Sequence, residues 1–234
     1  MHIVSLKDVA LAMPQPQTRS AERLLMSHLS FDLMAGENLA ILGPNGSGKT
    51  TILNLIRGIK EPSRGTVRVQ ASDEEVAHMP QDYRLALFPW LTFGTHPILY
   101  GNFPNGFDDE TFDEAVEAFG LAGLRNQPVY SLSGGEQQLL LLSSIMSCRA
   151  SLYLMDEPFS AVDIKRKGAA IEFVHDRIRD LSASVIFVTH NIQDVGLLAS
   201  KVLIVSGVPD VVPQLYERQN VENFEETIRD VAGI

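Results

Sequence analysis

The fold of this chain is decided by the stretch Gly43-Pro44-Asn45-Gly46-Ser47-Gly48-Lys49-Thr50, which fits the pattern GxxxxGK[ST] without a gap. Glycines in such a loop let successive backbone N–H groups point inward at phosphate oxygens, and the lysine adds a positive charge near the β- and γ-phosphates. The threonine hydroxyl can bind Mg²⁺, and a helix that begins here directs the positive end of its dipole at the anion. The stretch therefore predicts a site for the phosphates of a nucleotide.

The residues around this loop have the patterns of an α/β fold. The apolar run at 38–42 before it predicts a buried strand, and the spacing of the apolar residues at 52–56 after it predicts one face of a helix. Further strands are predicted in six apolar runs, near residues 3–6, 66–70, 76–79, 151–155, 184–189 and 201–205. These runs alternate with helical patterns, which is typical of a largely parallel sheet covered on both faces.

Two helices with apolar stripes and one irregular segment complete the pattern. Both stripes are predicted to face the core; they are Ile171, Val174, Ile178 and Leu181 in a helix at about 165–181, and Val221, Phe224, Ile228 and Val231 near the C-terminus. Between about 84 and 130 strand-like runs vanish and prolines interrupt the chain. A short acidic helix, Asp108 to Phe119, follows them. We interpret this segment as a lobe inserted into the nucleotide-binding core.

The composition argues against several classes of protein. The 19 basic and 29 acidic residues give a net charge of −10, whereas a surface that coats nucleic acid needs clustered Lys and Arg. No apolar run approaches the ~18 residues that cross a bilayer, and the N-terminus lacks the features of a secretion signal. The single cysteine, Cys148, excludes an internal disulfide and lies in an apolar helical stretch, so we expect a packed core thiol. We expect a cytoplasmic protein with no nucleic-acid partner.

A second chemical feature is the strand that ends in Asp156-Glu157. Side chains of a strand alternate between its faces, so the two carboxylates cannot do the same task. One can reach Mg²⁺ and the other can orient an attacking water beside the γ-phosphate. Such a strand end is often only a helix cap, but together with the phosphate loop it predicts a metal ligand and a general base.

The stretch Leu132-Ser133-Gly134-Gly135-Glu136 opens a very apolar helix, 137–146. A serine and two glycines at a helix start make a second anion-binding site. A protein with one bound nucleotide does not need two such sites. The second site has a function if it binds the nucleotide that a neighbouring subunit holds. Taken alone, these residues also fit a capped helix with a flexible start.

With these motifs in this order, the chain resembles the ATP-binding cassette ATPases, the nucleotide-binding subunits of ABC transporters. The resemblance covers nearly the whole chain and adds Gln81 as a glutamine-loop candidate, 160–163 as the D-loop and His190 as the switch histidine. It implies one nucleotide-binding domain over 1–234, with a P-loop NTPase core at 1–83 and 132–234 and a helical subdomain at about 84–131. The core would hold a mostly parallel sheet and an N-terminal antiparallel β part.

The resemblance also implies a role for each motif residue, with ATP and Mg²⁺ as cofactors. Glu157 would polarise the water, His190 would contact the γ-phosphate and Lys49 would hold the phosphates. Mg²⁺ would be served by Thr50, Gln81 and Asp156. The nucleotide would be bound by Gly43, Pro44, Asn45, Gly46, Ser47, Gly48, Lys49, Thr50, Thr51 and Gln81, and from the opposite protomer by Ser133, Gly134, Gly135 and Glu136, with Asp163 linking the two sites.

Three stretches, at 87–92, 156–160 and 189–195, look like those of bacterial importer ATPases, especially the nitrate/sulfonate/taurine group. The implied function is ATP hydrolysis that drives a transmembrane permease by closure of a cassette dimer, expected to be a homodimer peripheral to the inner face of the membrane. The permease would dock on the helical subdomain, with Phe88 and Trp90 either in that surface or in the lobe core. A soluble ATPase acting on a protein assembly, such as an iron–sulfur scaffold, and a regulator without transport remain alternatives.

The chain departs from the family pattern at three positions. Where the family places an aromatic residue on adenine, this sequence has Met13. After the stretch 132–136, which the resemblance makes the family's signature motif, Leu139 and Ser144 occupy positions where arginine is common, so turnover could be reduced.

Overall fold

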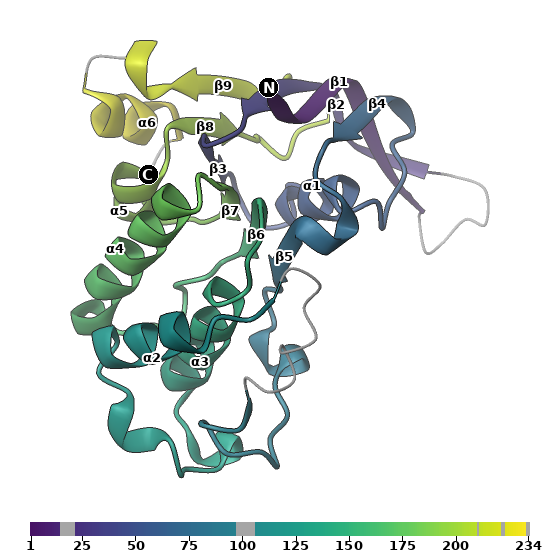
Figure 1. The fold of residues 1–234 in the computed structure, drawn as a ribbon. Coiled ribbons are helices and arrows are strands. Elements are labelled where there is room, and N and C mark those ends of the chain that lie inside the picture. The colour runs from purple at the N-terminus through teal and green to yellow at the C-terminus, as the bar shows by residue number, and fades with distance from the viewer. Residues whose placement is uncertain (15–21, 97–105, 210, 221–222, 233–234) are drawn as a thin grey trace. The chain divides into compact units, whose positions relative to one another are not determined.

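The structure is a computed structural model that describes residues 1–14, 22–96, 106–209, 211–220 and 223–232. The chain forms two compact units (Figure 1). Unit 1 comprises Met1–Ser72 and Ile186–Ile234, and unit 2 comprises Asp73–Val185. The boundary between Val185 and Ile186 falls within strand β7, Ser184–Val188.

Unit 1 begins with an antiparallel sheet, as the family resemblance implies. Its strands are β1 (His2–Pro14), β2 (Glu22–Met34) and β4 (Arg64–Val69), in the order β2-β1-β4. The predicted strand near 3–6 is only the first part of β1, and β2 was missed. In β1, a register shift between Leu6 and Val9 explains where the prediction stopped, because it puts both residues on the buried face although they are three positions apart. This bulge interrupts the alternation on which strand prediction depends.

The rest of unit 1 carries the phosphate loop. Strand β3 (Asn38–Leu42) pairs in parallel with β8 (Lys201–Ile204), which pairs antiparallel with β9 (Gln214–Glu217). The helices are α1 (Lys49–Ile56), α5 (Ile192–Leu198) and α6 (Phe224–Ala232). The bounds of β3 match the prediction, whereas α5 and β9 were not predicted.

Helix α6 packs on α5, and its apolar stripe is only partly buried. Phe224 and Ile228 are buried as predicted, Val221 lies outside the described residues, and Val231 is 44% exposed, so its predicted place in the core is wrong. The reason is length: α5 has seven residues, about two turns, and Val231 lies in the third turn of α6. A two-turn neighbour cannot cover it.

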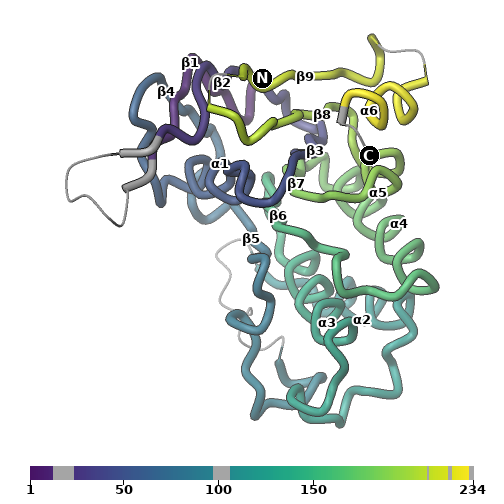
Figure 2. The backbone as a smooth tube through the Cα atoms, turned by 180° about the vertical axis from the view of Figure 1, so that it is seen from behind, coloured from purple at the N-terminus to yellow at the C-terminus, as the bar shows by residue number. Residues whose placement is uncertain are grey.

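Unit 2 contains the parallel strands β5 (Val76–Met79) and β6 (Leu152–Asp156), both predicted. Its helices are α2 (Asp109–Ala118), α3 (Gly134–Met146) and α4 (Ile164–Asp180), with short 3-10 turns between β5 and α3. The three helices contact one another and lie side by side in Figures 1 and 2. In α4 three of the four predicted stripe residues are buried, and the fourth, the C-cap residue Leu181, is only partly buried.

After its first turn, helix α3 is buried on all sides, from Gln138 to Met146, which explains the departures from the family pattern there. Leu139 and Ser144 are both fully buried. The Ser144 hydroxyl donates to the Leu140 carbonyl (2.9 Å), so no polar partner outside the helix is needed. Cys148 is buried as predicted, and burial raises the pKa of its thiol to about 12, so it stays protonated and unreactive. An arginine at 139 or 144 would bring a charge into this apolar surrounding.

Candidate active site

The phosphate loop joins β3 to α1 in unit 1 and holds the lysine against its own backbone. The Lys49 ammonium donates to the carbonyls of Gly43 (2.8 Å) and Pro44 (2.9 Å) and is largely buried. Gly48 stands at the N-cap of α1 with φ +97°, in the left-handed region that favours glycine. It has no side chain to cap the helix, and the first turn carries no acidic residue. The helix dipole, the first-turn N–H groups and the ammonium thus all favour an anion here.

The loop's first glycine is fixed by its neighbours, and this gives a testable prediction. A Cβ on Gly43 would stand 2.2 Å from the carbonyl oxygen of Val205 and 3.0 Å from Ser47 Oγ. Because the first obstacle is backbone, we expect Gly43→Ala to lower the free energy of unfolding by about 2–3 kcal/mol. Gly46→Ala is the matched control, since a Cβ there meets nothing within 4 Å and only its φ of +78° is unfavourable, at about 1 kcal/mol. Urea unfolding without nucleotide measures both, and equal losses would contradict the role of the Val205 contact.

The switch-histidine candidate lies at the same sheet edge as the loop. Thr189, which follows β7, donates its N–H to the Ile41 carbonyl (3.3 Å), two residues before Gly43. The Thr189 hydroxyl donates to the Asp194 carboxylate (2.9 Å) and accepts from the Asn191 N–H (3.1 Å). Thr189 and Asp194 are buried and His190 is exposed. The turn that exposes His190 is therefore stabilised by the buried hydrogen bond between the Thr189 hydroxyl and the Asp194 carboxylate.

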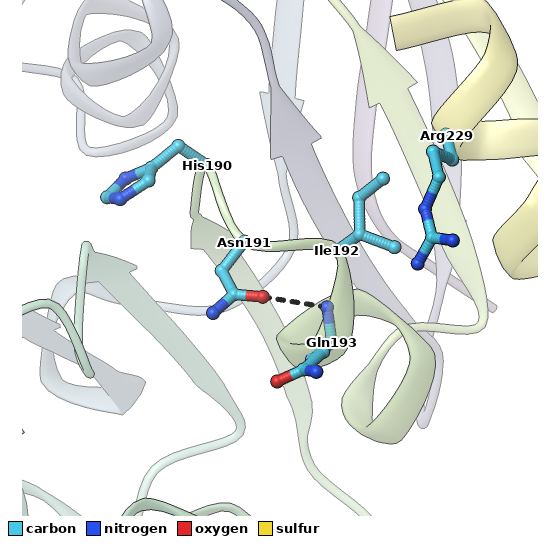
Figure 3. A pocket seen from close by; sticks show the side chains of 5 residues that line it. All are labelled: His190, Asn191, Ile192, Gln193 and Arg229. Atoms are coloured by element: carbon cyan, nitrogen blue, oxygen red, sulfur yellow. Dashed lines mark hydrogen bonds between the residues drawn. The ribbon is translucent and has the colours of Figure 1, made fainter. Parts of the chain in front are cut away.

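His190 also lines a pocket of about 420 Å³ with Asn191, Ile192, Gln193 and Arg229 (Figure 3). Figure 3 shows the Asn191 side chain accepting the Gln193 N–H, and Arg229 reaching in from α6 while the His190 ring points away from it. None of these residues belongs to the phosphate loop. We therefore do not identify this pocket with the nucleotide site.

In unit 2 the two predicted carboxylates stand at the end of β6. Asp156 is 2% exposed and Glu157 is 8% exposed. Glu157 has φ +54°, a left-handed conformation that costs a residue with a side chain about 1–3 kcal/mol. Such strain gathers at functional sites, where the surroundings hold the residue in place.

The signature residues begin α3 with a complete capping box. Ser133 Oγ accepts the Glu136 N–H, while the Glu136 carboxylate accepts the Ser133 N–H (2.8 Å) and hydroxyl (2.7 Å). Burial opposes ionisation of Glu136, but the hydrogen bonds from Ser133 and the charge of Arg166 outweigh it and lower its pKa. Arg166 reaches Glu136 (3.6 Å) and also Asp163 (3.9 Å), the D-loop residue that caps α4. The signature and the D-loop are thus tied together.

The glutamine-loop candidate and the docking candidates also lie in unit 2. Gln81 is exposed and precedes a short 3-10 turn, Tyr83–Ala86. A Cβ added to Gly134 would stand 2.7 Å from Tyr83 Oη in this turn. Trp90 is 73% exposed, so the lobe-core alternative does not apply to it, and its ring meets that of Phe88 edge to face. The segment that follows Gln81 therefore presents aromatic rings to solvent.

The structure brings the predicted residues together in two groups. Unit 1 holds the phosphate loop with Lys49, Thr50 and Thr51, and also His190, whereas unit 2 holds Gln81, Ser133 to Glu136, Asp156, Glu157 and Asp163. The Mg²⁺ candidates offer a hydroxyl, an amide oxygen and a carboxylate, all hard oxygen donors that fit this ion. Across the described ranges, no helix has the length and apolar character to cross a membrane.

Sequence reasoning missed two residues of this site, Gln138 and Arg166. Gln138 is 1% exposed and hydrogen-bonds with the turn after Glu157. A polar side chain at the start of an otherwise apolar helix is a signal that could have identified it. Arg166 lies on an amphipathic helix rich in charge, and nothing in the sequence distinguishes it from its neighbours.

Together, a phosphate loop at a helix start, a buried Asp-Glu strand end and a turn that presents a histidine define a nucleotide-hydrolysing P-loop protein. The family model described as ABC transporter matches residues 26–160, and the chain belongs to this family. The predicted family and its enzyme class, an ATPase, are thereby confirmed, and the alternatives without transport are not favoured.

Relatives and solved structures agree with this assignment. The molybdate/tungstate import ATP-binding protein WtpC of Archaeoglobus fulgidus is 35% identical over 80% of this chain and 82% of its own length. The taurine import ATP-binding protein TauB of Roseobacter denitrificans is 31% identical over 82% of this chain and 74% of its own. A putative metal-chelate type ABC transporter in an inward-facing conformation superposes with a TM-score of 0.74, at 25% identity, over 97% of this chain and 87% of that one.

The fold is also that of a dimeric ATP-binding cassette in a post-hydrolysis state bound to ADP and Pi. Its TM-score is 0.76 at 21% identity, over 92% of this chain and 98% of that one. The predicted α/β class, with its parallel sheet and N-terminal antiparallel part, is therefore confirmed.

Proposed function

We propose that this chain is the ATP-hydrolysing subunit of an importer, and that two identical copies complete each other's nucleotide sites. One observation carries the proposal: the chain has two separate helix starts suited to anions, one at Gly48 in unit 1 and one at Ser133 in unit 2. The first has a lysine and a strand-borne loop, and the second has a serine, two glycines and their N–H groups, with the Glu136 carboxylate bound to Ser133. The second suits a lid over a triphosphate that another copy holds.

In this proposal each motif residue has one task. Lys49 and the loop N–H groups bind the β- and γ-phosphates, and His190 donates to the γ-phosphate. Glu157 accepts a proton from the attacking water as the water oxygen bonds to the γ-phosphorus; the bond from that phosphorus to the β-phosphate oxygen breaks, and ADP and inorganic phosphate are released. Thr50, Gln81 and Asp156 would hold Mg²⁺, which would supply positive charge near the phosphate oxygens.

The proposed permease contact is an apolar surface of unit 2, formed by Leu85, Phe88, Trp90 and Tyr130, which are 83%, 39%, 73% and 70% exposed. The Tyr130 N–H bonds to the Pro89 carbonyl (3.2 Å), which brings two of its segments together. Exposed apolar patches of this kind mark binding surfaces. ATP can drive a permease through it because a nucleotide that binds the closed dimer better than the open one shifts that equilibrium.

The composite site is tested by mixing two inactive variants. Lys49→Ala removes the lysine of the phosphate loop, and Ser133→Arg blocks the lid with a larger side chain. In a homodimer of either variant, both nucleotide sites are therefore inactive. A heterodimer of the two variants has both lesions at one site and an intact second site. We expect the equal mixture to recover about a quarter of wild-type ATPase activity, because half of the dimers are mixed and each has one of two sites intact.

Each variant alone is the control, and nucleotide binding by the Ser133→Arg monomer should match wild type because the lid belongs to the other copy. A mixture as inactive as its components would count against composite sites. Release of phosphate measures activity, and calorimetric titration measures binding.

A further inference from the structure

Gln138 is a buried amide in which every polar group is used. It lies in the second turn of α3, five residues after Ser133, and is 1% exposed. Its Nε2 donates to the Glu157 carbonyl (2.8 Å) and lies 3.4 Å from Ser160 Oγ, and its Oε1 accepts the N–H of Ala161 (2.7 Å). One side chain thus bridges the two ends of the turn from Glu157 to Ala161.

These partners permit one orientation of the amide. A backbone carbonyl stands at one end and a backbone N–H at the other, so a flipped amide would face oxygen with oxygen and N–H with N–H. A buried group of this kind is costly to leave without partners, which makes the bridge rigid.

The turn that Gln138 holds is the one in which Glu157 is strained. Glu157 has φ +54°, and its carbonyl accepts the Gln138 amide (2.8 Å) and, over a longer distance, the Ser160 N–H (3.3 Å). Left-handed residues with side chains persist where the surroundings over-determine them. The Gln138 amide supplies such a constraint from outside the turn.

A second contact joins the same two segments. A Cβ on Gly135 would stand 2.7 Å from the Ala161 carbonyl, so the start of α3 approaches the turn as closely as a glycine allows. Arg166 adds the ion pair to Glu136. The lid residues at the start of α3 and the turn after β6 therefore move together.

We propose that Gln138 is a positioning residue that fixes the Glu157 turn and ties its geometry to the lid at Ser133. The inference rests on the proposed function, in which Glu157 accepts the proton of the attacking water. Seating of the lid on a neighbour's triphosphate is then transmitted through α3 to the carboxylate of the same chain.

The first test is a pair of matched variants on one helix. Gln138→Met keeps the length of the side chain and removes its hydrogen bonds to the Glu157–Ala161 turn. We expect kcat to fall on the order of 30- to 100-fold because the Glu157 carboxylate is then misplaced. The KM for ATP should stay within about twofold, since Gln138 touches no group that binds the nucleotide. Gln137→Met is the control, because Gln137 also donates to two backbone carbonyls, of Val129 (3.0 Å) and Leu132 (3.3 Å), away from the turn. Its kcat should stay within about threefold of wild type.

A double-mutant cycle separates positioning from general damage. In a Glu157→Gln background the carboxylate is already absent, so adding Gln138→Met should lower the single-turnover rate by less than about threefold. The same loss in both backgrounds, or a kcat for Gln138→Met equal to that of the control, would overturn the proposal.

Hydrogen exchange gives a readout that needs no turnover. In the nucleotide-free protein, the peptide that contains Ala161 should exchange faster in Gln138→Met and unchanged in Gln137→Met, because only the first loses the bond to that N–H. Gln138→Glu, which keeps the acceptor but sets an oxygen against the Glu157 carbonyl, is the second variant and should show the same loss of kcat. If the wild-type protein hydrolysed no ATP, the proposed function would fail, whereas unaltered exchange at Ala161 would refute the Gln138 bridge by itself.

Discussion

Glu157→Gln is expected to lower ATP turnover on the order of 1000-fold while MgATP holds the protein as a dimer. A glutamine keeps the shape of the side chain but cannot accept the proton of the attacking water, and a positioned general base contributes about 10²- to 10⁴-fold. Binding should survive, because the phosphate loop is in unit 1 and is untouched. Phosphate release measures turnover, and size-exclusion chromatography with MgATP measures the dimer.

The control for this prediction is Glu172→Gln, an exposed position on α4 in the same unit, which should turn over as wild type does. Normal hydrolysis by Glu157→Gln would mean that another group takes the proton. A variant that is inactive and also monomeric with MgATP would mean that Glu157 acts in dimer closure rather than in chemistry.

Local pattern was enough to predict the elements that carry the site. The strand before the phosphate loop was predicted with its observed bounds, 38–42, because it is a short run that is apolar after Asn38 and lies next to a motif that fixes its end. The acidic helix was placed to within one residue at each end, since Asp108 is a favoured residue type for an N-cap and is the observed N-cap, and Asp109 and Glu110 stand in the first turn. Where a motif or a cap marks a boundary, sequence alone defines it.

The missed elements have no such marks. Strand β2 is thirteen residues long with a bulge between Met26 and Leu29, so these two buried residues are three positions apart and do not keep a period of two. Strand β9 has four residues, none of them buried, and takes its place from pairing with β8. Tertiary pairing decides such segments, and local propensity does not.

The site was predictable in its parts and unpredictable in its connections. The role of Glu157 as general base was predicted from the strand end and stays a prediction. Its left-handed backbone and the Gln138 bridge could not be predicted, because the bridge joins residues nineteen positions apart through a particular packing of α3. Likewise the capping box of Ser133 and Glu136 is readable from sequence, whereas the Arg166 link to it, thirty positions away, is not. Residue types indicate the chemistry of a site, and only the fold shows which contacts hold those residues in place.

Lys49→Ala is expected to weaken nucleotide binding on the order of 100-fold, or about 3 kcal/mol. The Lys49 ammonium is 7% exposed and lies against the carbonyls of Gly43 and Pro44, where it offsets the charge of a bound triphosphate in a partly desolvated loop. Removing one member of such a charge pair costs about 2–5 kcal/mol, and every 1.4 kcal/mol is tenfold in affinity. Calorimetric titration of ATP measures the change directly.

The matched control is Lys7→Ala, an exposed lysine of β1 in the same unit, which removes the same charge from the protein as a whole. It separates the local contact from the general attraction of a positive charge for ATP, because this chain has a net charge of −10 and any lost lysine makes it more negative. If both variants lost affinity for ATP equally, the Lys49 ammonium would act only through the electrostatic field of the whole protein. A loss confined to Lys49→Ala requires that the triphosphate sits in the loop itself.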